Sequence, residues 1–154
     1  MPRLKKKELV DVIIDAGFDK KAEEIVSIDL KKVESRFCEH FVICHALSNV
    51  HVQSIADGIY RMVKKEMHIS PNSYEGYENA SWILLDYGNV VAHIFKEYDR
   101  RHYDLEKLWS DGKIKKHFPA KSAVMQVKEK AVKKVSTHKI VKTSKRITAT
   151  KKSK

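Results

Sequence analysis

The chain has 154 residues and a formal net charge of +11, and this charge is divided unevenly. Residues 113–154 carry 15 basic side chains against one acidic one, whereas residues 1–112 carry 16 basic and 19 acidic side chains. No apolar run approaches the roughly 18 residues of a membrane span, and no apolar signal segment follows the N-terminal charges. The sequence therefore predicts a cytoplasmic protein without membrane contact, in which a mildly acidic body and a basic extension bind different partners.

The first half of the body predicts a helix, two strands and a second helix. Apolar residues within 5–16 form one helical stripe, and Gly17 is a plausible stop for this helix. Residues 18–23 are polar and form either a connector or a continuation of the helix. Residues 25–30 and 40–46 have the composition of strands, and the second is apolar enough to lie in the centre of a sheet. Residues 49–67 place apolar side chains at the spacing of an amphipathic helix.

The second half predicts a β-hairpin followed by a helix. Two apolar runs, 82–85 and 90–95, flank a turn that contains Gly88 and Asn89. The charged and aromatic segment that ends at Trp109 has apolar residues at helical spacing. Hairpins are antiparallel and a connection through a helix favours parallel strands, so the predicted fold class is α/β, with a mixed β-sheet flanked by helices.

The remaining segments have the composition of connections. Residues 31–39 are charged and predict a loop, and residues 69–79 predict a loop or a short edge strand. Residues 1–112 are expected to form the domain, and residues 113–154 a Lys-rich basic extension that is largely disordered.

The sequence lacks the patterns that nucleotide-dependent or metal-dependent catalysis needs. Its five Gly are scattered, so neither G-x-G-x-x-G nor a P-loop occurs. No D-x-D or E-x-D pair lies on a strand, and the adjacent Glu23 and Glu24 would point to opposite faces if a strand began there. Asp86 stands alone at the hairpin turn, where turn chemistry accounts for it. Cys38, His40, Cys44 and His45 lack the spacing of a zinc site, and Cys44 is expected to be a small buried hydrophobe. We predict no catalytic residue, no metal, no cofactor and no enzymatic activity.

The hairpin and the segment after it hold the residues that could bind a partner. His93 alternates with two hydrophobes in an apolar strand, which favours a hydrogen-bonded position in the core. Four aromatic residues lie close to two acidic ones, a composition found both in cores and in binding hot spots: Tyr87, Tyr98, Tyr103, Trp109, Asp104 and Glu106. Composition alone leaves both interpretations open.

The segment W-I-L-L-D-Y-G-N-V-V-A-H-I-F, followed by R-x-x-Y-D-L-E-K-L-W, resembles the ribosomal silencing factor family, also called Iojap-like. Upstream, A-E-E-I-V-S-I-D-L, F-V-I-C, S-I-A-D and Glu75-Gly76 occur in the family's order, so the resemblance covers about residues 6–111. It implies a sandwich similar to nucleotidyltransferases, without their catalytic carboxylates. It also implies binding to large-subunit ribosomal protein L-fourteen, a steric block of the association of the two ribosomal subunits, and repression of translation.

The resemblance also assigns roles to individual residues. Ten are expected to bind the partner: Glu75, Asp86, Tyr87, Arg100, Tyr103, Asp104, Leu105, Glu106, Leu108 and Trp109. Four are expected to serve the fold: Gly76, Trp82, Gly88 and His93. Ribosomal proteins are generally basic, so an acidic and aromatic surface has the complementary charge. The chain departs from the family's pattern at residues 45–51, and any contact made by that loop would differ here.

Other functions remain compatible with the sequence. The 113–154 tail could contact rRNA, and an RNA-binding ribosome assembly factor that acts mainly through this tail is the alternative to the silencing factor. A residual nucleotidyltransferase rests on fold analogy alone. A homodimer would also suit a protein with an open sheet edge and an aromatic surface.

Overall fold

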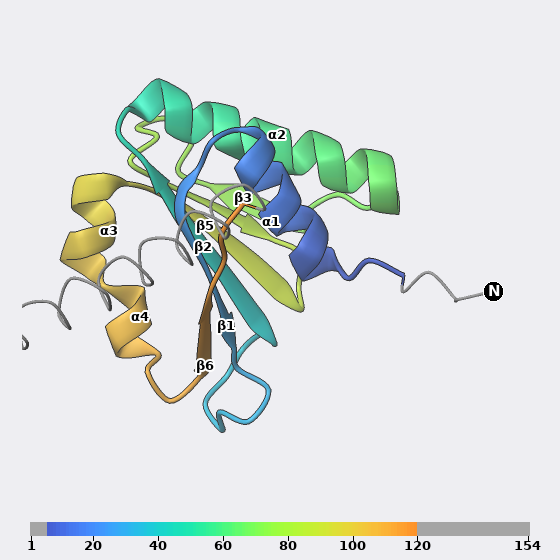
Figure 1. The fold of residues 1–154 in the computed structure, drawn as a ribbon, viewed down its shortest axis with the longest axis vertical. Coiled ribbons are helices and arrows are strands. Elements are labelled where there is room, and N and C mark those ends of the chain that lie inside the picture. The colour runs from blue at the N-terminus through green and yellow to red at the C-terminus, as the bar shows by residue number, and fades with distance from the viewer. Residues whose placement is uncertain (1–5, 120–154) are drawn as a thin grey trace, which may run out of the picture. The chain divides into compact units, whose positions relative to one another are not determined.

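A computed structural model gives the structure of the protein, and it describes residues 6–119 (Figure 1). The described residues form one sheet of six strands in the order β3-β4-β5-β2-β1-β6, with helices on both of its faces. In chain order the elements are α1 (Leu9–Asp19), β1 (Glu23–Asp29), β2 (His40–Ala46), α2 (Asn49–Met67), β3 (Ser73–Glu75), β4 (Trp82–Asp86), β5 (Val90–Lys96), α3 (Glu97–Tyr103), α4 (Leu105–Leu108) and β6 (Lys113–Lys116). No helix among residues 6–119 is both long and apolar enough to span a membrane.

The sheet is mixed, as the sequence predicts. Strands β2 and β5 are parallel neighbours, and the chain that connects them includes α2. The pairs β1–β2 and β4–β5 are antiparallel. Both central strands are buried along almost their whole length, in agreement with their apolar composition. Strand β3, at one edge, corresponds to the short edge strand expected within 69–79.

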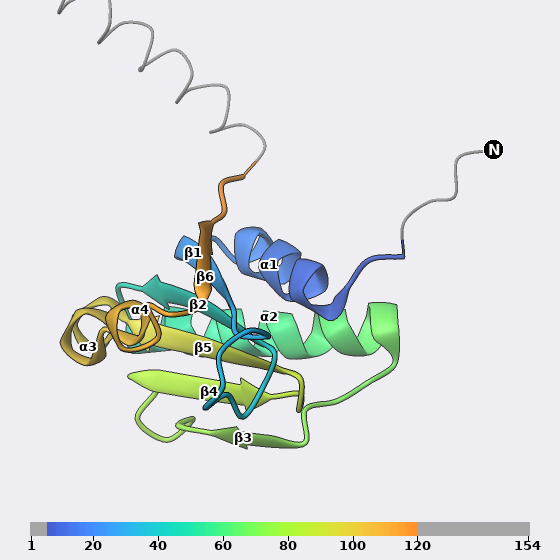
Figure 2. The same ribbon diagram turned by 90° about the horizontal axis from the view of Figure 1, so that it is seen from below.

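The two faces of the sheet are covered differently (Figure 2). The amphipathic helices α1 and α2 lie on one face, where their buried residues pack against alternate residues of β2, β4 and β5. The other face packs against α4 and the 31–39 loop, through residues such as Cys38, Leu105 and Trp109. The protein therefore has two cores, one on each side of the sheet.

The first helix does not stop at Gly17, and the alternative of a continuation beyond it is the one that the structure shows. It continues through Gly17 to Asp19, because Gly17 is buried and brings the helix against β1. A Cβ atom at Gly17 would lie 2.9 Å from Cδ1 of Ile25, so close packing explains the glycine. The chain turns instead at Lys21, which has a φ of 57°.

The expected last helix is divided into α3 and α4. Asp104 lies between them with a φ of 43°, a left-handed conformation that interrupts the regular helix. The apolar spacing that predicted one helix is present, but it reflects burial of Leu105 against the sheet. Trp109 follows α4 as its cap residue.

The sheet extends into the basic segment. Residues 113–116, which were expected to belong to the basic extension, form β6 and pair with Val26–Asp29 of β1. The amide of His117 also donates to the carbonyl of Ile25, and its side chain bonds the Ser27 hydroxyl at 2.7 Å. The compact unit therefore reaches His117. The disorder expected for the rest of the extension concerns residues 120–154, which lie outside the described part of the chain.

Candidate functional site

Large apolar side chains are exposed on the sheet face opposite α1 and α2. Phe37 is 67% exposed, Tyr103 51% and Leu108 71%, and Trp82 and Trp109 are half-buried on the same face. We call these five residues the aromatic surface. They come from the 31–39 loop, β4, α3 and α4, so the fold brings together segments that are distant in sequence.

The rings of the aromatic surface pack in two groups. Trp82 stacks on Phe95 with their centroids 4.8 Å apart, and Tyr103 lies 4.9 Å from Trp82. Trp109 meets Phe37 edge to face at 5.8 Å and Phe41 at 5.5 Å. These geometries are those that aromatic pairs prefer, so the surface is held in shape by its own contacts.

The aromatic surface is exposed because the helices on this face are short. Helices α3 and α4 have seven and four residues, compared with eleven and nineteen for α1 and α2. They leave Trp82 and Leu84 of β4 partly exposed to solvent, whereas the residues of β5 on this face are buried. An exposed apolar patch of this kind marks an interaction site in a folded protein.

His93 lies in the sheet beneath the aromatic surface and contacts both groups of rings. It is 3% exposed, its Nδ1 accepts a hydrogen bond from Nε1 of Trp82 at 3.2 Å, and its ring lies edge to face with Phe41 at 4.7 Å. Burial lowers the pKa of His93 to about 4, so the ring is neutral and its proton is on Nε2. Nε2 is buried without a hydrogen-bond partner among the described residues. The predicted hydrogen-bonded core position of His93 is confirmed.

Two of the predicted fold residues are glycines that shape turns. Gly76 has a φ of 89°, and a Cβ atom there would lie 1.9 Å from the carbonyl oxygen of Trp82. Gly88 has a φ of 87°, and its amide donates to Oδ1 of Asp86 at 2.7 Å. Other residues would be strained at both positions. Asp86 thus has the turn role that its place in the hairpin suggests.

Glu75 lies on the same face of the sheet as the aromatic surface. It pairs with Leu84, which pairs with His93, and residues paired across strands share a face. Glu75 is exposed and Leu84 half-buried, so this row carries the apolar face out to an acidic edge on β3.

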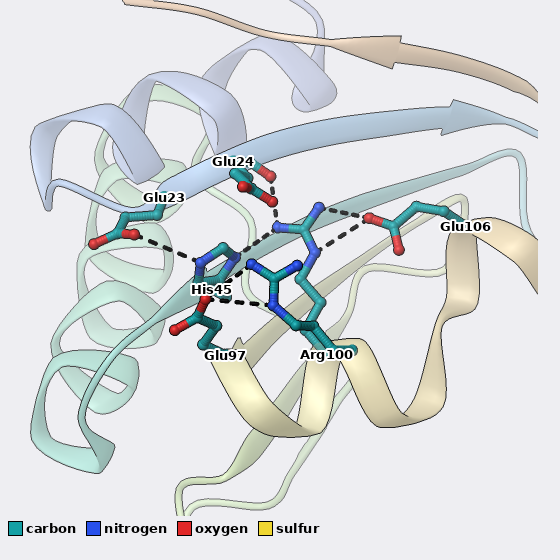
Figure 3. A network of polar contacts seen from close by, with 7 residues as sticks. Glu23, Glu24, His45, Glu97, Arg100 and Glu106 are labelled. Atoms are coloured by element: carbon teal, nitrogen blue, oxygen red, sulfur yellow. Dashed lines mark hydrogen bonds and ion pairs between the residues drawn. The ribbon is translucent and has the colours of Figure 1, made fainter.

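Beside the aromatic surface, a buried arginine ties several elements together (Figure 3). Arg100 of α3 is 6% exposed. Its Nη1 donates to the carbonyl oxygen of Glu24 at 2.6 Å and contacts Nδ1 of His45 at 2.9 Å. Its Nε and Nη2 both donate to Oε1 of Glu106, at 3.2 and 2.5 Å. We call Arg100, His45 and Glu106 the arginine network.

His45 is held neutral in this network. Burial, and then the neighbouring Arg100 guanidinium, lower the pKa of His45, which is 2% exposed. Because Nδ1 accepts from Arg100, the ring proton is on Nε2, which lies 3.6 Å from a carboxylate oxygen of Glu23. A cavity of about 320 Å³ adjoins the network, and four acidic residues line it together with His45, Arg100 and Arg101: Glu24, Glu97, Asp104 and Glu106.

The structure separates the ten predicted partner-binding residues by exposure. Glu75, Tyr103 and Leu108 are exposed, and Asp86, Asp104, Glu106 and Trp109 are half-buried. Tyr87, Arg100 and Leu105 are buried, so their side chains offer little surface to a partner. Tyr87 lies in the core under α1 and α2, where burial raises the pKa of its hydroxyl.

Sequence reasoning missed Phe37 and His45. Phe37 lies in a charged loop far from the hairpin, and its isolated position there was the only signal that it might contact another aromatic. His45 carries no signal in the sequence, because its role depends on Arg100, 55 residues away.

The thiols and acidic groups show no arrangement for chemistry in the described part of the chain. Among residues 6–119 no three His, Cys, Asp or Glu side chains are grouped so that they could hold a metal. Burial raises the pKa of Cys38 to about 11 and that of Cys44 to about 12, so both thiols stay protonated. Cys44 is 2% exposed and packs in the core beneath the helices, which confirms the prediction of a small buried hydrophobe.

The fold and the exposed surface define a small α/β protein suited to binding another macromolecule. Comparison with known families makes this specific, because the family described as "Ribosomal silencing factor during starvation" matches residues 3–152. The chain belongs to this ribosomal silencing factor family, whose members are ribosome-associated regulators of translation. The match extends beyond the 6–111 segment on which the resemblance in the sequence rests, into the basic extension.

Individual relatives and solved structures support the same family membership. The chain is 42% identical over 104 residues to a ribosomal silencing factor of Halalkalibacterium halodurans, which covers 68% of this chain and 87% of the relative. It is 36% identical over 111 residues to that of Bacillus subtilis, covering 72% and 92%. A crystal structure from Bacillus halodurans has a TM-score of 0.58 at 40% identity, over 66% of this chain and 92% of that one. A second, from Chromobacterium violaceum, has a TM-score of 0.64 at 27% identity, over 76% and 96%.

Proposed function

We propose that this protein acts in the cytoplasm as an anti-association factor: it binds large-subunit ribosomal protein L-fourteen through the aromatic surface and so keeps the small subunit from joining. The mechanism is steric, with no bond made or broken. The observation that carries the proposal is the exposure of Phe37, Tyr103 and Leu108 on one face of a protein of this family. Family membership supports a partner on the large subunit.

The charge around the aromatic surface fits a basic protein partner. Glu75 is exposed on the same face, and Asp104 and Glu106 are half-exposed between and within the helices that carry Tyr103 and Leu108. Binding hot spots combine aromatic anchors with a polar rim, which is the arrangement seen here. Acidic groups at the rim would steer a basic surface toward the aromatic side chains.

Co-sedimentation with isolated large subunits tests binding, and light scattering during subunit association tests the block. We expect the full chain to pellet with large subunits at physiological salt and to reduce the scattering increase. Leu108→Glu, which places a charge on a side chain already 71% exposed, should abolish both effects without unfolding the protein. Binding by this variant as tight as that of the unchanged chain would exclude the aromatic surface as the docking site.

To test the role of the extension, the chain must be shortened without removing β6. Removing residues 113–154 would leave the edge of β1 without its partner strand, so the protein should instead be ended after Pro119. We expect this shortened chain to bind the large subunit, with a weaker dependence on salt because fewer phosphates are neutralised.

An RNA-binding assembly factor is the second candidate. The 15 basic side chains of residues 113–154 favour it, and so does a mouse relative, 27% identical over 106 residues, named as a mitochondrial protein of large-subunit assembly. This chain spans 45% of that relative's length. If the chain ended after Pro119 no longer binds the large subunit, the tail-based function replaces the first proposal. A second copy on the aromatic surface is a further outcome, which the mass in solution would reveal.

A further inference from the structure

We propose that Arg100 is a positioning residue that holds α4 in place, and with it Leu108 and Trp109 of the aromatic surface, without touching the partner. This inference rests on the proposed function for its binding consequence. Its structural part, the attachment of α4 to the sheet, stands on the arginine network alone.

Helix α4 needs such an attachment because it cannot hold its own conformation. It has four residues, far fewer than the dozen or so that an isolated helix needs to be stable in water. It follows Asp104, whose left-handed conformation disconnects it from α3. Within α4 only Leu105 is buried, while Leu108 is 71% exposed. Contacts outside the helix must therefore fix its position.

The arginine network adds polar contacts from three directions to the apolar packing of Leu105 and Trp109. From α3, Arg100 reaches Glu106 in α4 with two hydrogen bonds, the end of β2 at His45, and the start of β1 at the Glu24 carbonyl (Figure 3). The Glu24 carbonyl is available because the pairing of β1 with β2 is irregular there and Glu24 has a φ of 45°. One side chain thus connects the sheet, α3 and α4.

A direct contact of Arg100 with the partner fits the geometry less well. Its side chain is 7% exposed, and its Nε, Nη1 and Nη2 atoms are all engaged within the protein. Only the planar fork of a guanidinium can reach a carbonyl, an imidazole and a carboxylate from one position, so lysine would keep the charge but lose most of the network.

The decisive experiment compares Arg100→Lys with Arg101→Lys. Arg101 is the next residue on α3, is exposed, and pairs with Glu97 of the same helix, so its replacement is a matched control outside the network. Hydrogen exchange would follow the amides of Leu108 and Trp109, which bond the carbonyls of Asp104 and Leu105. Co-sedimentation with large subunits would measure affinity.

We expect Arg100→Lys to speed exchange at the α4 amides at least tenfold and to weaken binding at least tenfold. Hydrogen exchange in the central strands should stay slow. A general loss of stability would instead speed exchange in these strands as well. Arg101→Lys should change neither quantity. Weakened binding with α4 still protected would show a direct contact, and faster exchange with unchanged binding would show that α4 order is irrelevant to docking. Either result overturns the proposal.

Two further arms keep the test decisive. If circular dichroism shows that Arg100→Lys does not fold, the double variant Arg100→Met/Glu106→Leu removes both charged partners, so that neither is left buried alone. The same change in exchange is then expected, and protected α4 amides would refute the inference. Exchange is the readout for this variant, because Glu106 is itself one of the acidic groups at the rim of the aromatic surface. If the unchanged chain fails to bind large subunits, the proposed function fails, while the exchange data still decide whether Arg100 holds α4.

Discussion

The two faces of the sheet differ in how completely they are buried. On the helix-covered face, 21 buried hydrophobic residues of the described chain form one core, ten of them from α1 and α2, and the buried residues of α2 extend from Val52 to Val63. On the other face the core of the described residues has nine buried hydrophobic side chains, and Phe37, Tyr103 and Leu108 remain in contact with solvent. The difference indicates that the helix-covered face supplies most of the free energy of folding. The other face buries fewer side chains and leaves an apolar surface that a partner can cover.

The largest expected effect comes from a cavity on the helix-covered face. Ile59→Ala removes a fully buried side chain of α2 and should lower the free energy of unfolding by about 2 to 5 kcal/mol. The affinity of the folded fraction for large subunits should be unchanged, because the aromatic surface is on the other face. Urea denaturation and co-sedimentation check the two parts, and a loss of affinity in the folded fraction would show that the faces are not independent.

The next effect concerns pH and the buried His93. Its folded pKa of about 4 lies below the ordinary value of 6.5, so the unfolded chain binds a proton that the folded chain does not. Stability should therefore fall as pH drops from 6.5 toward 4, by up to about 3 kcal/mol from this residue. Denaturant unfolding across this range measures it.

His93→Gln is the control for that pH dependence. Glutamine keeps an acceptor for Nε1 of Trp82 but does not titrate, so the slope of stability against pH should decrease in the same window. An unaltered slope would assign the pH dependence to other groups, such as His45, whose pKa is also lowered.

On the exposed face, Trp109→Ala and Leu108→Ala should separate packing from docking. Trp109 packs on Phe37 and Phe41, so its loss should weaken binding by about 2 kcal/mol or more and also reduce stability. Leu108 is 71% exposed, so its truncation should leave stability within about 0.5 kcal/mol while still weakening binding. Circular dichroism must accompany both affinities. Equal affinities for both variants and the unchanged chain would contradict the docking assignment.

The smallest expected effect is electrostatic. Asp104→Asn keeps a residue that tolerates the left-handed conformation and removes one charge, whereas Asp104→Lys reverses it. We expect the association rate with large subunits to fall in the order Asp, Asn, Lys, and the differences to shrink as salt is raised. An order that is independent of salt would point to the backbone of Asp104 and not to its charge.

The sequence predicted the elements that depend on local periodicity. The parallel pairing of β2 and β5, the helix 49–67 and the hairpin all follow from apolar spacing and turn residues, and the structure confirms them. The end of α1 could not be fixed from the sequence, because Gly17 is a plausible stop but in the structure serves close packing against Ile25 while the helix continues to Asp19. The division into α3 and α4 depends on one left-handed residue, Asp104, which apolar spacing cannot reveal.

The site was less accessible to sequence reasoning because it is assembled from distant segments. The motif ending at Trp109 drew attention to Tyr103 and Leu108, which the structure shows to be exposed. The same motif suggested Arg100 as a contact, although its charge is buried against Glu106 and His45. A sequence motif cannot distinguish residues that form a surface from residues that hold it, since both occur at the same spacing.

Strand β6 has a consequence for how the protein is made. The side chains of Ser27 and His117, which join the last described strand to the first, are 90 residues apart in the chain. Pairing over such a separation must overcome the entropy of closing a long loop, so we expect it to form after the local pairs. Until residues 113–116 have been synthesised, the backbone groups of β1 along Val26–Asp29 have no neighbour on that side. During this interval the nascent protein presents an unpaired strand edge, and the Lys-rich strand that later covers it makes the finished edge unattractive to other strands.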